Sequence, residues 1–285
     1  MHKRFIKPLR SIRTMAKSNL SSWIHSPRTL IMLLFVIAFC FLVTNNYIQG
    51  FRGLDYELHF FEALFVVLYT GCSITTTSIL FLVTISELPK RIGYQYSNLI
   101  RSSRIEWMAS QIVYCMWMAL GMLVLTVMSA SIFLLFNVPI GNTWSDTARI
   151  GTEVIQESQA LIPSFFRNTF TPLEACLFAM LPMYLFWFTM ILVVLLFSLC
   201  QLPMVGLMTY ALMLVANIVL MVESFSDLPL PIYYATIGNI TTGWIGKEMQ
   251  KVNEAFMGYG VAIICLLICM FLIIRKIDLC FQAEE

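Results

Sequence analysis

The stretch Glu87–Gln111, ELPKRIGYQYSNLIRSSRIEWMASQ, separates two long apolar runs of the chain. It is the longest polar interruption with a positive balance, because its four basic residues outnumber its two acidic ones. If the flanking runs cross a membrane, a basic connection of this kind belongs on the cytoplasmic side. It is also long enough to hold short helices. We therefore expect residues 87–107 to form a structured cytoplasmic loop.

The composition of the whole chain indicates a membrane protein. Of its 285 residues, 59% are hydrophobic and only 12% are charged, whereas about a quarter of the residues are charged in an ordinary soluble domain. A soluble core of this size could not hide so many apolar residues without leaving large exposed patches. We expect a single domain, 1–285, that is an all-α integral membrane protein.

The apolar runs predict six transmembrane helices. Four are the runs at about 29–43, 60–86, 108–136 and 256–274, the first of which is short for a hydrocarbon core that needs roughly 20 residues. The run from Ala175 to Val222 contains no charged residue and is too long for one span. Gln201-Leu202-Pro203 is the expected turn within it, because proline and a polar amide interrupt the run there.

The basic residues predict how these spans are oriented. Residues 1–28 hold seven basic residues, no acidic one, and apolar residues at roughly helical spacing. This pattern predicts an amphipathic elbow helix on the inner leaflet, with its cations toward anionic headgroups, although a disordered basic tail is the alternative. With both termini cytoplasmic, thirteen basic residues lie inside and five outside, as the positive-inside rule requires. The segments 137–171 and 223–254 are then extracytoplasmic.

The sequence motifs of several kinds of binding and catalytic site are absent from this chain. No G-x-x-x-x-G-K-[ST] phosphate cradle and no H-E-x-x-H helix is present, so we do not expect the chain itself to bind ATP or a catalytic metal. Nearly all eight cysteines lie in apolar runs, which argues against a disulfide framework. Cys265 and Cys269 share a helix face, where packing is a far commoner role than metal binding. We expect neither enzymatic activity nor a nucleic-acid partner.

The second span carries an unusual set of hydroxyl side chains near its middle. The members that we single out are Thr70, Ser73, Thr76 and Thr77. Small and hydroxyl residues allow membrane helices to approach closely and to hydrogen-bond with each other. Helix packing is therefore one interpretation of this face, and the lining of a polar pathway or of a dimer interface is the other.

The order of these parts resembles the permease subunit of a type-2 ABC exporter. That family has a cytoplasmic elbow helix, six spans, a coupling helix between spans two and three, and a tight turn between spans four and five. Arg101–Gln111, RSSRIEWMASQ, is similar to the segment that enters span three in such permeases. The resemblance covers nearly the whole chain, but it is one of architecture. The extracytoplasmic segment 137–171 is longer than is common in the family.

The resemblance implies a separate ABC ATPase subunit, which would hold ATP and Mg²⁺, and a second permease that is the same or a sister chain. It implies a multi-pass protein of a bacterial plasma membrane, surrounded by lipids, that exports a hydrophobic or amphipathic peptide, lipid or drug. The residues expected at the contact with the ATPase are Gly93, Tyr94, Gln95, Tyr96 and Ser97, with Arg101, Arg104 and Glu106 at its edge. Alternatively, the loop has no partner, and its basic residues only fix the orientation of the neighbouring spans in the membrane.

Two other functions are compatible with the sequence. A polytopic sensor, immunity factor or assembly scaffold would work without any ATPase. An ion-coupled carrier would depend on an intramembrane carboxylate, for which Glu62 and Glu174 are the candidates. Both lie about one turn inside the expected outer end of a span, a position that is more typical of an interfacial carboxylate.

Overall fold

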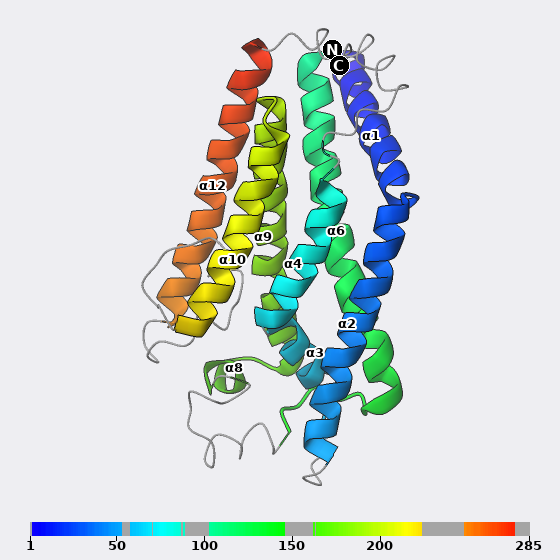
Figure 1. Cartoon of the computed structure of the whole chain (residues 1–285), viewed down its shortest axis with the longest axis vertical. Helices are drawn as coiled ribbons and strands as arrows, with labels where there is room; N and C mark the ends of the chain where they lie inside the picture. Colours follow the sequence, from blue (N-terminus) through cyan, green and yellow to red (C-terminus); the bar gives the residue numbers. More distant parts are fainter. Residues whose placement is uncertain are drawn as a thin grey trace.

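The computed structural model describes residues 2–52, 58–69, 71–86, 88, 103–145, 162, 164–223 and 248–276. Within these ranges all regular structure is helical, which confirms the all-α class (Figure 1). The helices are α1 (His2–Ile24), α2 (Pro27–Arg52), α3 (Phe60–Tyr69), α4 (Gly71–Ile85), α6 (Arg104–Asn137), α8 (Ser164–Thr169), α9 (Pro172–Leu199), α10 (Pro203–Glu223) and α12 (Glu248–Lys276).

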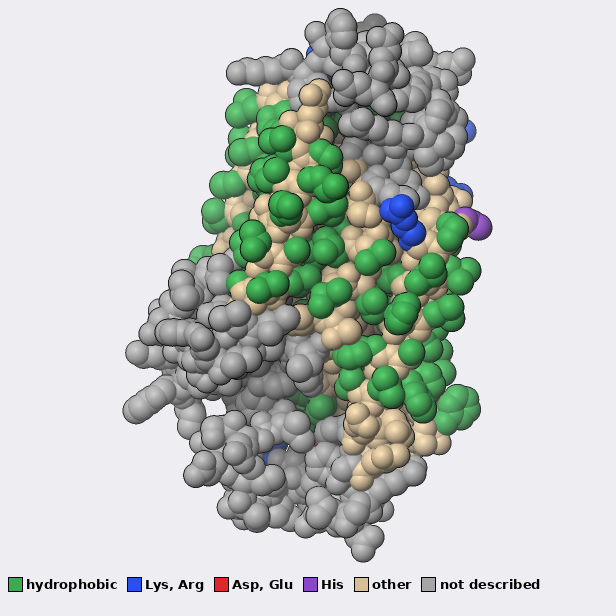
Figure 2. Space-filling view, in the orientation of Figure 1, with side chains coloured by type: hydrophobic (Ala, Val, Ile, Leu, Met, Phe, Trp, Pro, Cys, Tyr) green, Lys and Arg blue, Asp and Glu red, His purple; other side chains and the backbone are tan. Residues whose placement is uncertain are grey.

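Four of these helices are long and apolar enough to cross a membrane. The stretches that meet both conditions are Pro27–Asn46, Arg104–Asn137, Pro172–Leu199 and Phe256–Arg275. Large exposed apolar side chains cover much of the outer surface of the bundle (Figure 2). The chain is therefore a multi-pass α-helical membrane protein. Helix α10 is also apolar, but its described apolar stretch, Pro203–Ala216, is shorter.

The second span differs from the continuous helix expected over 60–86. It consists of α3 and α4, whose axes, taken over Phe60–Leu68 and Ser73–Ile85, differ by 61°. If this bent pair counts as one span, the described part of the chain has five. The sequence favours a break here, because Gly71 is a weak helix former. In addition, the Thr77 hydroxyl donates to the Ser73 carbonyl oxygen at 2.6 Å, an interaction that tends to bend a helix.

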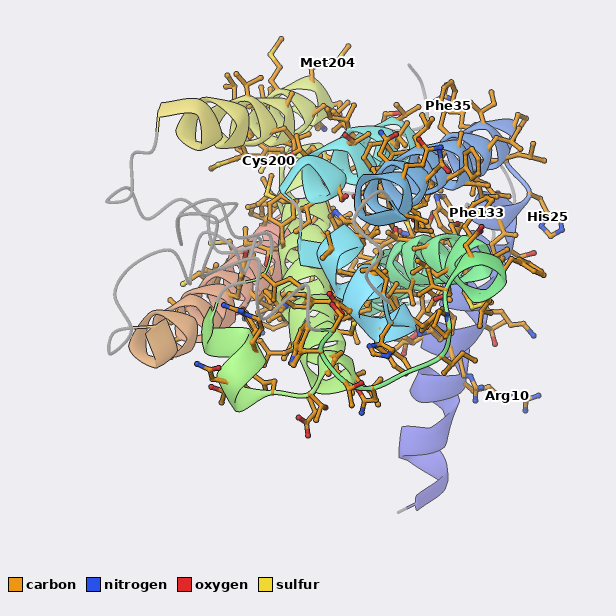
Figure 3. All side chains as sticks on the ribbon, turned by 90° about the horizontal axis from the view of Figure 1, so that it is seen from below. Arg10, His25, Phe35, Phe133, Cys200 and Met204 are labelled. Atoms are coloured by element: carbon orange, nitrogen blue, oxygen red, sulfur yellow. The ribbon has the colours of Figure 1, made fainter. Side chains whose placement is uncertain are left out.

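Helix α9 is the centre of the bundle. It contacts α3, α4, α6, α10 and α12, and in the end-on view it stands between α12 and the group formed by α2, α4 and α6 (Figure 3). In its apolar stretch 61% of the residues are buried, against 17% in α12. Phe186, Trp187 and Ile191 are completely buried, and α9 supplies more buried apolar residues than any other described helix.

The turn between α9 and α10 lies where the sequence predicts it. Gln201 has a φ of 63°, and the Gln201 and Leu202 amides donate to the Ser198 and Phe197 carbonyl oxygens. These two bonds form a Schellman motif, which satisfies carbonyl groups at the end of a helix. Pro203 then begins α10, a position where its missing N–H and fixed φ are tolerated.

Helix α1 forms as expected, but its apolar face does not lie free for lipid. Met15, Ala16, Asn19 and Trp23 are buried, and α1 packs along α6. The Trp23 ring lies against Gly121 of α6, 3.5 Å from the point where a Cβ atom would stand. The sequence did not indicate this contact, because an amphipathic pattern is the same whether lipid or another helix covers the apolar face.

Candidate functional site

Only part of the expected ATPase contact can be located. Residues Gly93, Tyr94, Gln95, Tyr96, Ser97 and Arg101 lie outside the described residues. Arg104 and Glu106 are in the first turn of α6, the helix that leads out of this loop. The structure therefore describes the exit of the loop but not its centre.

The exit of the loop is fixed by a capping box. The Glu106 amide donates to the Ser103 hydroxyl at 3.2 Å, and the Ser103 amide donates to the Glu106 carboxylate at 3.4 Å. This reciprocal pair satisfies two backbone amides that the helix itself cannot. Glu106, which we expected only at the edge of a docking contact, is thus an N-terminal capping residue.

Helix α6 is longer than a membrane span. Its 34 residues measure about 51 Å at 1.5 Å per residue, against about 30 Å for the hydrocarbon core. Its two charged residues, Arg104 and Glu106, are both in the first turn. Helix α1 packs along the first half of α6, up to Gly121.

The hydroxyl face of the second span is mostly enclosed by its own chain. Ser73 and Thr77 are 2% and 0% exposed, and Thr76 is partly buried. Thr70 lies outside the described residues. Helix α4 packs against α2, α9 and α10, and the buried Ser73 hydroxyl has no hydrogen-bond partner among the residues that the structure describes. The described members of this face therefore point into the helix contacts of one bundle.

A buried hydrogen-bonded group joins α4 to α9 and α10. The Trp187 indole N–H donates to the Ser78 hydroxyl at 2.8 Å, and the Tyr210 hydroxyl donates to the Ser78 carbonyl oxygen at 3.1 Å. The Trp187 ring also contacts Phe81, with the ring centres 5.8 Å apart. Trp187 and Tyr210 were not among the residues expected from the sequence. Both are aromatic residues with a hydrogen-bond donor inside an apolar run. This feature could have identified them, because a buried Trp or Tyr usually finds a hydrogen-bond partner.

Glu62 is part of a second buried group, at the opposite end of the bundle from the capping box. It is 1% exposed, and its two carboxylate oxygens accept bonds of 2.9 Å from the amide and the hydroxyl of Ser145. Beside it, the His59 ring packs closely on Gly141. Glu62 thus fixes the segment after α6 onto the start of α3.

Three further contacts tie this segment, Asn137–Ser145, to the start of α9, to Phe170 just before it and to α3, and with the Glu62 pair they form what we name the outer clasp. The Trp144 indole N–H donates to the Phe170 carbonyl oxygen at 2.8 Å, and the Asn142 side chain accepts from the Leu173 amide at 2.9 Å. The Trp144 ring meets Phe65 edge to face.

Glu174, the other candidate carboxylate, is exposed and accepts from the Thr171 amide at 2.8 Å as a capping residue of α9.

Among the residues that the structure describes, no three His, Cys, Asp or Glu side chains are grouped so that they could hold a metal ion. Comparison of the chain with known protein families, with curated proteins and with solved structures finds no match.

Proposed function

We propose that this chain is the membrane-spanning subunit of an ATP-driven exporter of the type-2 ABC class, powered by a separate ATPase that binds ATP and Mg²⁺. The observation that carries the proposal is the long α6. It begins at the exit of the loop, extends about 20 Å beyond the length of a span, and contacts α1, α2, α3, α9 and α12. A force applied at Ser103 would be transmitted through α6 to the five helices that it contacts.

The arrangement of the helix ends supports the same proposal. The start of α1, the start of α6, the α9–α10 turn and the end of α12 lie toward one end of the bundle (Figure 1). The end of α4 lies in the same half, beside the start of α2. The connections between α1 and α2 and between α9 and α10 are short, whereas residues 86–103 join α4 to α6. This is the long connection at that end, so it is where an external motor would act.

The charges at this end support a cytoplasmic orientation. The described charged side chains there are Arg10, Arg13, Lys17, Arg28, Arg104, Arg275 and the single acidic Glu106. Such an excess of basic residues is typical of the cytoplasmic side. We therefore place both termini inside, with α3 and α4 as one broken span and α10 as the fifth of six, in a bacterial plasma membrane.

In this proposal the nucleotide-driven closure of two ATPases moves two permease chains, the same or sister, between inward-open and outward-open states. The cargo class is a hydrophobic or amphipathic peptide, lipid or drug. Ser73, Thr76 and Thr77 would contribute to a pathway only if α4 separates from α2 or α10, because Ser73 and Thr77 are buried in the described state.

The test is to purify the tagged chain in a mild detergent from its native membranes and to identify the proteins that accompany it. We expect a P-loop ATPase in equal amount, which is lost when Tyr94 and Tyr96 are both replaced by alanine. The matched control is Thr14→Ala with Ser21→Ala, two exposed positions of α1 at the same end of the bundle, which should leave the complex intact.

A chain that is recovered alone, and whose activity in cells survives deletion of the neighbouring ATPase genes, would overturn the proposal. That result would favour a sensor, immunity factor or assembly scaffold instead.

A further inference from the structure

The two halves of the second span pack on different neighbours. Helix α3 packs chiefly on α9, whereas α4 packs chiefly on α2 and α10. The halves meet next to Gly71, where the axis changes direction by 61°. In Figure 1, α3 lies beside the start of α9, and α4 continues at an angle toward the other end of the bundle. One span therefore belongs to two separately packed regions.

The outer region is held together by contacts that end before the bend. The outer clasp joins α3 to Asn137–Ser145 and this segment to the start of α9. The Phe65 ring of α3 also contacts Phe166 of α8, with the ring centres 5.1 Å apart. The Phe61 carbonyl oxygen of α3 accepts a bond from the Cys176 thiol of α9 at 3.2 Å. Helix α3, Asn137–Ser145, α8 and the first two turns of α9 therefore form one connected unit, which we name the outer lid.

Both helices that leave the outer lid have a break at the same level. The thiol bond inside the lid and the bond from Trp187 to Ser78 farther along both join the second span to α9. Residue numbers increase together from the first bond to the second, so the two segments run in the same direction. Between these bonds, Gly71 lies just past the middle of the second-span residues and Pro182 just past the middle of the α9 residues. The two residues therefore lie at nearly the same level of the bundle.

Gly71 and Pro182 are both weak points in a helix. Glycine stabilises a helix less than any residue except proline. Pro182 lies inside α9 and has no N–H, so the Phe178 carbonyl oxygen loses its usual helical partner. Just after Gly71, the bond from the Thr77 hydroxyl to the Ser73 carbonyl oxygen further favours bending. The outer lid is thus joined to the inner region through two points where a helix bends easily.

We propose that the outer lid moves as one body about Gly71 and Pro182, against an inner body formed by α4, α10 and the rest of α9. The inner body is fastened separately, by the buried group around Ser78. The lid is closed in the described state, because α3 also touches α2 and α6, so its movement leads away from these helices. Opening would give access from the outer end of the bundle to the start of α4, where the buried Ser73 hydroxyl has no partner among the described residues.

The test measures distances between pairs of spin labels by electron paramagnetic resonance, on the full chain in lipid nanodiscs. The labels are attached to an unnatural amino acid that carries a ketone, so the native cysteines stay in place. Thr143 in the lid and Val83 in the inner body are both exposed. A rotation of about 20° about Gly71 would move the far end of α3, roughly 15 Å away, by about 5 Å. We expect the Thr143–Val83 distances to spread by about that much more than those of Val83–Val215, an exposed pair within the inner body.

Gly71→Ala combined with Pro182→Ala should narrow the Thr143–Val83 distribution to the width of the inner pair. Alanine favours a continuous helix at both points and restores the missing N–H at the second. Gly258→Ala on α12 is the matched control and should leave both distributions as they are in the wild type. The inner pair, measured in every variant, reports whether the fold is intact.

A second pair tests whether the lid is one body. Thr143 and Asn168 of α8 are exposed positions within the lid, and their distribution should be narrow in the wild type and broader in Glu62→Ala. A wild-type Thr143–Val83 distribution as narrow as the inner pair would overturn the proposal. So would a double variant that folds but keeps the broad distribution, or a Thr143–Asn168 pair as broad as Thr143–Val83. The measurements need no ATPase, so they are independent of the exporter proposal.

Discussion

At the scale of single residues, a small number of the described polar contacts connect distant parts of the chain. Ser78 meets Trp187 and Tyr210, which follow it by 109 and 132 residues, and Glu62 meets Ser145, 83 residues away. In hydrocarbon, helices gain little from burying apolar surface against each other, so such bonds and close packing decide which faces meet. Glu62 is thereby a positioning residue of the outer clasp in the described state.

Replacing Glu62 by alanine should destabilise the protein by roughly 1–3 kcal/mol, because the amide and the hydroxyl of Ser145 would both lose their buried acceptor. Glu62→Gln keeps one acceptor oxygen and should therefore destabilise the protein less. The measurement is the thermal unfolding midpoint in one detergent, together with protease cleavage within Asn137–Ser145. The matched control is Glu174→Ala, which removes an exposed capping carboxylate and should cost less stability. If the Glu62→Ala variant is as stable as the wild type, Glu62 does not stabilise the outer clasp.

At the scale of helices, the close approach of α9 and α10 depends on a glycine. A Cβ atom on Gly206 would stand 3.0 Å from the Phe197 Cβ atom and 3.2 Å from the Val194 Cα atom. Small residues at such points are what allow membrane helices to pack tightly. The Schellman turn immediately before it fixes the direction in which α10 leaves α9, so neither helix can shift far to make room.

Gly206→Ala should therefore destabilise the chain by about 1–3 kcal/mol, as overpacking of a close contact does. Gly258→Ala is the control, because no described atom outside the adjacent backbone of α12 lies within 4 Å of the corresponding point. There the higher helix propensity of alanine should stabilise by up to about 1 kcal/mol. Unfolding midpoints of the two variants in the same detergent make the comparison, and equal effects would argue against the tight α9–α10 contact.

At the scale of the whole molecule, the sequence predicts the positions of the helices better than their contacts. The apolar runs give the spans and Gln201-Leu202-Pro203 gives the turn, because hydropathy and turn chemistry are local properties. Gly71 favours a break between α3 and α4, but the size of the bend, the packing of α1 on α6 and the burial of Ser73 and Thr77 were not predictable. They depend on which helices become neighbours, which a single sequence does not state. The residues from Gly93 to Ser97 remain a prediction.

The orientation can be tested by labelling single cysteines, introduced into a cysteine-free chain, from either side of sealed membrane vesicles. We expect Ser86→Cys and Ser103→Cys to react from the cytoplasmic side and Asn142→Cys from the opposite side. Six spans with both termini inside require this pattern, since an odd number of crossings separates Ser103 from Asn142 and none separates Ser86 from Ser103. Labelling of all three positions from one side would overturn the topology.

The central place of α9 also affects how the chain is made. Synthesis proceeds from the N-terminus, so α2, α4 and α6 enter the membrane before Pro172, the first residue of their shared neighbour, has left the ribosome. Until Trp187 and Tyr210 arrive, Ser78 has neither of its partners from α9 and α10, and the faces that α9 will cover meet only lipid or one another. The first half of the protein can form its own contacts, those of α1 and α2 with α6 and of α2 with α4, but the bundle is completed only late in translation, when α9 and α10 are added.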